Sequence, residues 1–410
     1  MRRVTRSVEQ LALFGGTPAF SSVLHVGRPN VGDRTRLLDR IGDILDSRWL
    51  SNNGPYVREF EQRVADLAGV RHCVSTCNAT MGIQLLVQAL GLTGEVILPS
   101  LTFVASAHAL AWQGLTPVFC DVDPVTHNLD PARVQELITP RTSAIMGVHL
   151  WGRPCDVDAL DAVARRHGLV LIFDAAHAFA CSHRGRMIGG FGRAEVFSFH
   201  ATKFVNSFEG GAVVTDDDGL AERIRLTTNF GLSGPDEVAL LGTNAKLSEA
   251  AAAMGLTSLD SLDEFVAVNR DNWHAYRAAL RGVPGVHLAA FDPGERNNYQ
   301  YVVVEVDEDR AGVSRDQLQA VLLAENVMAR RYFHPGCHRL EPYRSRDPHA
   351  GDRLPQTRRL AGRLLVLPSG TAIGRTEIRV IGEIIRLVVG SVPTVRRRLG
   401  SVVRGAVAGG

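Results

Sequence analysis

Several features that would mark other classes of protein are absent from this sequence of 410 residues. No apolar run approaches the roughly 20 residues of a membrane span. The basic start, Met1-Arg2-Arg3, is followed by polar residues instead of the apolar core of a secretory signal. Lys and Arg number 45 against 43 for Asp and Glu, so the net charge of +2 gives no reason to propose nucleic acid as a partner. We expect a soluble, cytoplasmic protein.

Signatures of metal binding and of dinucleotide binding are also missing. The six cysteines form no CxxC pair, and Cys73 and Cys77 have no matching His/Cys pair that would complete a zinc site. We therefore expect no metal, and reduced cysteines that behave as small apolar side chains. No Gly-x-Gly-x-x-Gly follows an early strand, which disfavours a nucleotide-binding dehydrogenase, although the fold class alone would permit one.

Short apolar runs alternate with stretches of helical periodicity from residue 70 onward, which predicts an α/β domain with a mainly parallel, seven-stranded sheet. Helices are predicted near 80–90, 103–113, 131–138, 156–167 and 217–228. The link between the last two strands is too short for a helical crossover, so that pair is expected to be antiparallel. The predicted strands are His72–Thr76, Glu95–Leu98, Pro117–Val122, Ser143–His149, Leu169–Phe173, Glu195–Phe199 and Ala212–Thr215.

The texture changes after about residue 255, and a smaller α+β domain is expected there. Its predicted elements are a long helix (Leu256–Leu280), a strand (Tyr299–Val306), a helix (Arg315–Glu325), a surface loop or lid (Gly336–Arg358) and a final helix (Glu377–Val389) capped by Thr376. The predicted division is an N-terminal arm (1–25), a large domain (26–258), a small domain (259–392) and a disordered tail (393–410).

Two residues carry the chemistry that we predict. Asp174 ends a buried strand, where ligands bind in open α/β sheets, and its carboxylate could hold a pyridine nitrogen protonated. Lys203 follows Ser198-Phe199-His200-Ala201-Thr202 and precedes the pair Gly210-Gly211, which lets a backbone approach a ligand closely. Separately, each residue has a plain alternative, a helix N-cap for Asp174 and a surface lysine for Lys203. Together they indicate pyridoxal phosphate chemistry, in which the lysine amine condenses with the cofactor aldehyde.

Further candidates surround this pair. Ala79 and Thr80 open a helix, whose free N–H groups attract a phosphate, or they belong to an ordinary cap. Phe103 either stacks on the cofactor ring or is a core aromatic. His177 either contacts the ring's phenolic oxygen or is a buried structural histidine. Arg330, Arg331, Tyr332 and His334 either reach a sugar nucleotide or have ordinary surface and core roles.

The chain resembles the DegT/DnrJ/StrS family of sugar aminotransferases from about Gly15 to Val389. One departure is Ser207-Phe208 before Glu209, where the family commonly has a glycine; another is Ala79, where many members have Gly. The segments that carry the resemblance are Asn78-Ala79-Thr80, Pro99-Ser100-Leu101-Thr102-Phe103, Asp121-Val122-Asp123, His149-Leu150-Trp151-Gly152, Asp174-Ala175-Ala176-His177-Ala178, Ser198-Phe199-His200-Ala201-Thr202-Lys203 and Leu241-Gly242-Thr243-Asn244.

The resemblance implies fold type I of the pyridoxal phosphate enzymes and a homodimer with shared active sites. It implies Lys203 as the lysine that binds the cofactor, Asp174 at the pyridine nitrogen and His177 at the phenolic oxygen. Phe103 would stack on the ring. The phosphate would be held by Ala79, Thr80 and Ser198, with Asn244 reaching in from the partner subunit.

The expected reaction moves an amino group from L-glutamate to the keto carbon of a dTDP-linked 4-keto-6-deoxyhexose, in deoxyamino sugar biosynthesis. The versions Cys77-Asn78-Ala79-Thr80 and Gly94-Glu95-Val96-Ile97-Leu98-Pro99-Ser100 are most similar to such enzymes. Lys203 argues against the dehydration performed by members with His at that position. A transaminase acting on a 3-keto sugar or a cyclitol ketone is the alternative, and a regulator that binds the cofactor or a nucleotide sugar without catalysis is a third hypothesis.

Overall fold

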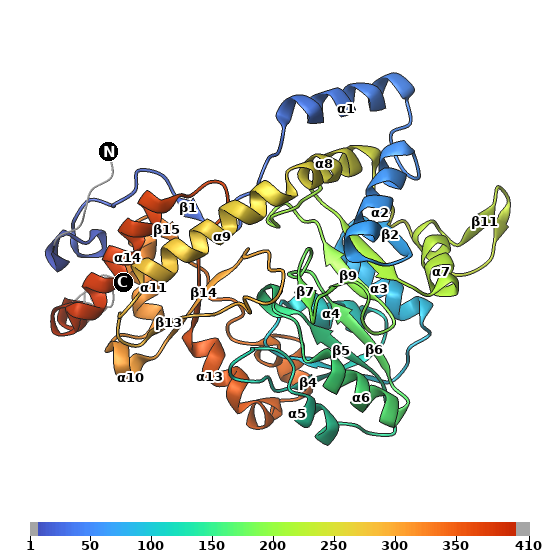
Figure 1. Ribbon diagram of the computed structural model, residues 1–410. Helices are drawn as coiled ribbons and strands as arrows, with labels where there is room; N and C mark the ends of the chain where they lie inside the picture. Colours follow the sequence, from blue (N-terminus) through green and yellow to red (C-terminus); the bar gives the residue numbers. More distant parts are fainter. Residues whose placement is uncertain (1–6, 399–410) are drawn as a thin grey trace.

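Two bodies joined by a long helix, α9 (Leu262–Ala279), make up the computed structural model, which describes residues 7–398 (Figure 1). The larger body holds a seven-stranded sheet in the order β2-β10-β9-β6-β5-β3-β4. β10 is antiparallel to both of its neighbours, and the other pairs are parallel. The prediction of fold class is confirmed, including the antiparallel last pair. The strands are β2 (His72–Thr76), β3 (Glu95–Pro99), β4 (Thr116–Cys120), β5 (Thr142–Val148), β6 (Val170–Asp174), β9 (Glu195–Ser198) and β10 (Gly211–Thr215).

Helices cover both faces of this sheet because alternate strand residues point to opposite sides. Leu171 and Phe173 of β6 belong to the core beneath α2, α6 and α8, whereas Ile172 belongs to the core beneath α3, α4 and α7. The predicted helices are therefore present, with ends shifted by a residue or two. Their bounds are α2 (Pro55–Ala68), α3 (Ala79–Ala89), α4 (Val104–Trp112), α5 (Pro131–Glu136), α6 (Val157–His167), α7 (Asp218–Thr228) and α8 (Glu249–Asp260).

The smaller body is built on an antiparallel sheet of β13 (Val286–Leu288), β14 (Val302–Val306) and β16 (Leu364–Leu367). The N-terminal segment belongs to this body, because β1 (Leu24–His25) pairs with β15 (Val327–Met328) and Leu11 and Phe20 are buried in its core. Glu325 secures the contact by accepting hydrogen bonds from the amides of Ala12 (2.6 Å) and Ala19 (2.7 Å). The other helices here are α10 (Glu308–Ala311), α11 (Arg315–Ala324), α12 (Tyr343–Arg346), α13 (Pro355–Arg363) and α14 (Arg375–Gly390).

Three predictions about the C-terminal half are wrong in detail. The single helix 256–280 is two helices, α8 and α9, that meet at Ser261. α14 begins at Arg375, so Thr376 lies inside it, and Gly374 is the N-cap. The predicted lid 336–358 contains α12 and two short 3₁₀ helices, and it packs on the large body through buried apolar side chains: Cys337, Tyr343, Ala350 and Leu354.

The remaining elements project from the two bodies. α1 (Arg34–Ser47) lies along the top of the molecule over α8, and the hairpin of β11 (Leu232–Gly234) and β12 (Glu237–Val238) extends beyond α7 (Figure 1). A second small hairpin joins β7 (Ser182–His183) to β8 (Arg186–Met187).

Two further observations concern the predicted tail and the membrane. Val395, within the predicted tail of 393–410, is fully buried in the core of the smaller body, and residues 399–410 lie outside the described part.

Between residues 7 and 398, no helix combines the length and the apolar character needed to cross a bilayer.

Candidate active site

A cavity of about 630 Å³ opens at the edge of the sheet where the parallel strands end. It lies at the carboxyl ends of β2, β6 and β9 and is closed on one side by residues of the smaller body. The residues predicted to hold the cofactor line it, except Asn244, whereas of the four candidates for sugar nucleotide contact only Tyr332 does so and Arg330, Arg331 and His334 do not. The lining residues are Asn78, Ala79, Thr80, Met81, Ile83, Thr102, Phe103, Ala105, Val148, Asp174, Ala176, His177, Ser198, His200, Thr202, Lys203, Glu209, Tyr301, Tyr332 and Phe333.

Asp174 is a buried carboxylate, 7% exposed, held at the floor of this cavity. Its Oδ2 accepts a hydrogen bond from Ser106 Oγ at 2.6 Å, and its Oδ1 accepts one from the Ala176 amide at 3.0 Å. The Ser106 hydroxyl is itself 3.1 Å from that of Thr102. Both carboxylate oxygens thus have the hydrogen-bond donors that a buried carboxylate requires.

Lys203 extends into the cavity, and its Nζ donates a hydrogen bond to the Tyr301 hydroxyl at 3.1 Å. Burial lowers the pKa of Lys203 to about 8, because the charged ammonium is poorly solvated there, and the negative charge of Asp174 opposes this shift. An amine with this pKa is neutral often enough near physiological pH to attack a carbonyl and to accept a proton.

His177 is fixed as a neutral hydrogen-bond donor. Its Nδ1 accepts the Trp151 amide at 3.3 Å, which leaves the proton of the neutral ring on Nε2. Burial holds the pKa of His177 well below its usual value, and the nearby charge of Lys203 adds to this effect. A donor in this position can bind an anionic oxygen.

The start of α3 forms a polar corner of the cavity. Asn78 caps the helix by accepting the Met81 amide at 2.9 Å, so the amides of Ala79 and Thr80 have no carbonyl partner within the helix. Gly211 lies directly against this corner, since a Cβ there would be 2.5 Å from the Ala79 nitrogen. Both the cap and the anion-binding alternatives predicted from the sequence are thus compatible with the same turn.

The pair Gly210-Gly211 permits close packing within the protein. A Cβ on Gly210 would be 2.1 Å from Ser207 Oγ, and the close approach of this backbone to a ligand stays a prediction. Phe208, where the family commonly has a glycine, adopts φ 61°, the left-handed conformation that a glycine favours.

Aromatic side chains form the wall opposite Asp174. Phe103, the N-cap of α4, lies 6.1 Å from Phe333 between ring centroids. Phe333 stacks on Tyr332 at 4.9 Å and on Trp151 at 5.4 Å, with interplanar angles of 8° and 6°. Tyr332 therefore lines the cavity, and contact with a sugar nucleotide stays a prediction.

Asn244 is exposed and does not line the cavity of its own chain. Its neighbour Ala245 accepts the Cys77 amide at 2.7 Å, which fixes the segment beside the start of α3.

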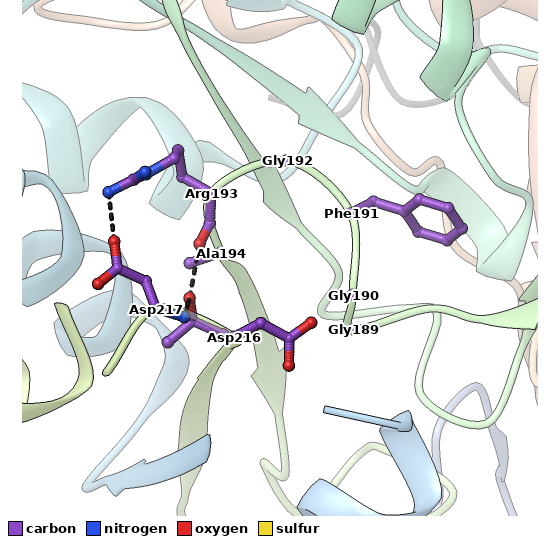
Figure 2. A pocket seen from close by; sticks show the side chains of 9 residues that line it. Gly189, Gly190, Phe191, Gly192, Arg193, Ala194, Asp216 and Asp217 are labelled. Atoms are coloured by element: carbon purple, nitrogen blue, oxygen red, sulfur yellow. Dashed lines mark hydrogen bonds and ion pairs between the residues drawn. The ribbon is translucent and has the colours of Figure 1, made fainter. Parts of the chain in front are cut away.

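A second hollow, of about 360 Å³, lies at the opposite edge of the sheet between Gly189–Ala194 and Thr215–Asp217 (Figure 2). Its charged groups are already paired, because Arg193 forms an ion pair with Asp217, and Asp216 is bound by Arg71. The amides of Gly189 and Phe191 donate to the buried Glu195 at 2.7 and 2.8 Å. This hollow is far from Lys203 and offers no catalytic group.

Several residues of the site could not be predicted from local sequence patterns. Ser106 is one polar residue in an apolar helix, four positions after Thr102, and only the fold brings it to Asp174. Tyr301 and Phe333 come from the smaller body, and no local pattern connects them with Lys203. Thr102 precedes the N-cap of α4 and Ser106 lies in its first turn, so helical periodicity does not link the two residues in the sequence.

The comparisons with known proteins agree with this geometry. The profile of the DegT/DnrJ/EryC1/StrS aminotransferase family matches residues 33–386. The chain belongs to this family. It is therefore a pyridoxal phosphate-dependent aminotransferase, and the dehydrogenase and regulator hypotheses are dropped.

Individual relatives cover nearly the whole chain. The dTDP-4-amino-4,6-dideoxy-D-glucose transaminase of Escherichia coli is 33% identical over 89% of this chain and 98% of its own. The GDP-perosamine synthase of Caulobacter vibrioides is 37% identical over 78% of this chain and 86% of its own. Among solved structures, DesI in the presence of its TDP-sugar product is 59% identical with a TM-score of 0.91, covering 96% of this chain and 100% of that one.

The cavity fits pyridoxal phosphate on its own chemistry. A helix start with two free amides suits a phosphate, a buried carboxylate suits a pyridine nitrogen, and Lys203 suits an aldehyde. When bound, the cofactor supplies that aldehyde and a ring that accepts electrons.

Gly211→Ala tests whether the polar corner at the start of α3 binds the cofactor phosphate, and we call this corner the phosphate corner below. The added Cβ would displace the start of α3 by steric contact with the Ala79 nitrogen, so we expect pyridoxal phosphate affinity to fall about tenfold or more in an absorbance titration. Gly219→Ala is the control, because its nearest neighbour would be 3.5 Å away. Equal affinities in the two variants would contradict the placement of the phosphate.

Proposed function

We propose that this enzyme transfers the amino group of L-glutamate to the C4 keto carbon of a dTDP-linked 4-keto-6-deoxyhexose. The product would be a nucleotide-linked deoxyamino sugar that is used in secondary metabolism, for example in antibiotic biosynthesis. The observation that carries the proposal is the convergence of Lys203 and the buried Asp174 in one cavity. Action as a homodimer in the cytoplasm is part of the same proposal.

The surroundings of each residue suit the role that we assign to it. Lys203 would hold the cofactor aldehyde through Nζ, and as a free amine it would move a proton between the donor's α-carbon and the cofactor's C4′ position. Asp174 would stabilise a protonated pyridine nitrogen, and His177 would donate from Nε2 to the phenolic oxygen. Ala79, Thr80 and Ser198 would hold the phosphate. The same groups would serve in reverse when the keto sugar receives the amine.

Two observations support a nucleotide-linked hexose as the acceptor. The relative from Escherichia coli is named for a dTDP-linked 4,6-dideoxy sugar, and DesI was solved with its TDP-sugar product. In addition, the aromatic wall of Phe103, Tyr332 and Phe333 gives the cavity a large apolar side. Such a surface suits the apolar face and the methyl group of a 6-deoxyhexose.

The homodimer is supported by exposed apolar side chains on α1, on the β11–β12 hairpin and on the segments that follow them. On and after α1, Leu45 is 62% and Trp49 48% exposed, and on the hairpin and its flank, Val238 is 66% and Leu241 81% exposed. Apolar surface gathered in this way is typical of an interface. A second copy of the chain that covers it would bring Asn244 toward the partner's phosphate corner.

Product analysis tests the reaction itself. With ¹⁵N-glutamate and dTDP-4-keto-6-deoxyglucose, NMR should find the label on C4 of the sugar, and Lys203→Ala should lower turnover by roughly 10²–10⁴-fold. Borohydride should fix the cofactor to Lys203 in the unaltered enzyme. Parallel incubations with a dTDP-3-keto sugar, a GDP-4-keto sugar and a cyclitol ketone are the comparison, and preferential amination of any of them would refute the proposed acceptor.

Subunit mixing tests the shared site. Lys203→Ala and Asn244→Asp each damage one site residue, and in a mixed dimer both defects fall in the same cavity if Asn244 serves the partner. The other cavity is then intact, so mixing the two inactive variants should restore up to about half of the activity per mixed dimer. A mixture that stays as inactive as its components, although sedimentation shows exchange of subunits, would place Asn244 in its own subunit's site.

A further inference from the structure

Tyr301 is a buried tyrosine that the smaller body contributes to the cavity of the larger one. It directly precedes β14, in the sheet of the smaller body, and its hydroxyl lies 3.1 Å from Lys203 Nζ. Its ring centroid is 4.3 Å from that of His177 and 5.6 Å from that of Trp151. The rings of His177 and Trp151 thus hold the Tyr301 hydroxyl next to Lys203 Nζ.

The segment that carries Tyr301 is tied to the loops of the active site. The Asn298 amide group donates to the carbonyl of His177 at 2.9 Å and to that of Phe179 at 3.1 Å. The Gln300 side chain donates to the Thr202 carbonyl, next to Lys203, at 3.1 Å. These contacts fix the position of Tyr301 relative to the lysine, since they bind the same backbone segments that carry His177 and Lys203.

Tyr301 stays a neutral phenol. Burial raises the pKa of its hydroxyl far above the usual value, and the proximity of Tyr332 and Asp174 acts in the same direction. A neutral phenol oxygen can accept a hydrogen bond from an ammonium group, and this bond is stronger than one from a neutral amine.

We propose that Tyr301 is a positioning residue for Lys203: it holds the free amine in place and, once the amine has taken up the donor's proton, stabilises the ammonium form until that proton is delivered. The inference rests on the role proposed above for Lys203. After displacement, the lysine is a flexible chain with an unattached end, and it must deliver a proton to one carbon. A hydrogen bond to a rigid phenol restricts that end to the edge of the cavity where the reaction takes place.

Other groups around Lys203 also act on its protonation. Asp174 favours the ammonium form, whereas burial and any positive charge on His177 or His200 oppose it, and Glu209 and Tyr332 line the same cavity. None of these groups changes in a Tyr301→Phe variant, which removes only the hydroxyl. The variant therefore isolates one hydrogen bond.

The test uses the full-length enzyme converted by L-glutamate to its pyridoxamine phosphate form, in which Lys203 carries no cofactor. Acylation of Lys203 with acetic anhydride is followed across pH by peptide mass spectrometry. For Tyr301→Phe we expect the midpoint of the profile to fall by about one pH unit, as the loss of one hydrogen bond to a charged group predicts. The rate constant of the glutamate half reaction should fall roughly tenfold.

The matched control is Tyr299→Phe, two residues away, whose ring packs on Phe291 at 4.7 Å within the smaller body. Its midpoint should equal that of the unaltered enzyme. Tyr301→Met, which also lacks a hydroxyl, should repeat the shift and protects the test against poor folding of one variant. An unchanged midpoint in either folded Tyr301 variant would overturn the proposal, whereas absence of a borohydride adduct on Lys203 would instead refute the role of the lysine.

Discussion

The site depends on keeping an amine and a carboxylate, with opposite requirements, in one cavity. Lys203 must lose its proton easily, and burial lowers its pKa to about 8 for that purpose. Asp174 is buried in the same cavity, where Ser106 and the Ala176 amide donate to its two carboxylate oxygens. In water a lysine would keep its proton at neutral pH, and a carboxylate would need no protein donors. Burial therefore eases the loss of the lysine's proton and makes polar partners necessary for the carboxylate.

A second buried carboxylate, Glu195, supports this arrangement through His149, which contacts the strand that ends in Asp174. The amide of His149 donates to the Asp174 carbonyl at 3.0 Å, and its ring stacks on Phe173 at 4.6 Å. His149 Nδ1 accepts the Cys155 amide, so Nε2 carries the proton and donates to Glu195 at 3.1 Å. Glu195 also accepts two loop amides, so a fully buried carboxylate is satisfied without exposure to water. The segment His149-Leu150-Trp151-Gly152 is thus a structural support of the site.

The sequence predicted what depends on local pattern and failed where distant contacts decide. β6 and the carboxylate at its end were predicted because an apolar run before Asp174 has one plausible place in a parallel sheet. The break between α8 and α9 was missed, since Ser261 has no helix-breaking character and the apolar positions continue across it. The start of α9 packs in the same core as α8, and its later turns pack in the core of the smaller body. The supposed lid, 336–358, is polar in composition, but four well-spaced apolar residues bury it against the sheet's helices. Tyr301 was missed because its importance exists only across the two bodies.

The position of Tyr301 on a different body from Lys203 has a consequence for the mechanism. The lysine, the carboxylate and the phosphate corner belong to the larger body, whereas Tyr301, Tyr332 and Phe333 come from the smaller one. The hydrogen bond from Lys203 to Tyr301 and the stack of Phe333 on Trp151 cross the boundary between the two bodies. A shift of the smaller body would therefore change two things together: the distance from Lys203 to the Tyr301 hydroxyl, and the position of the aromatic wall that limits the cavity. The position of the smaller body therefore affects both the hydrogen bonding of the Lys203 amine and the space beside it. The segment Asn298–Tyr301 makes this connection, because it is hydrogen-bonded to the active-site loops and continues directly into β14 of the smaller body's sheet.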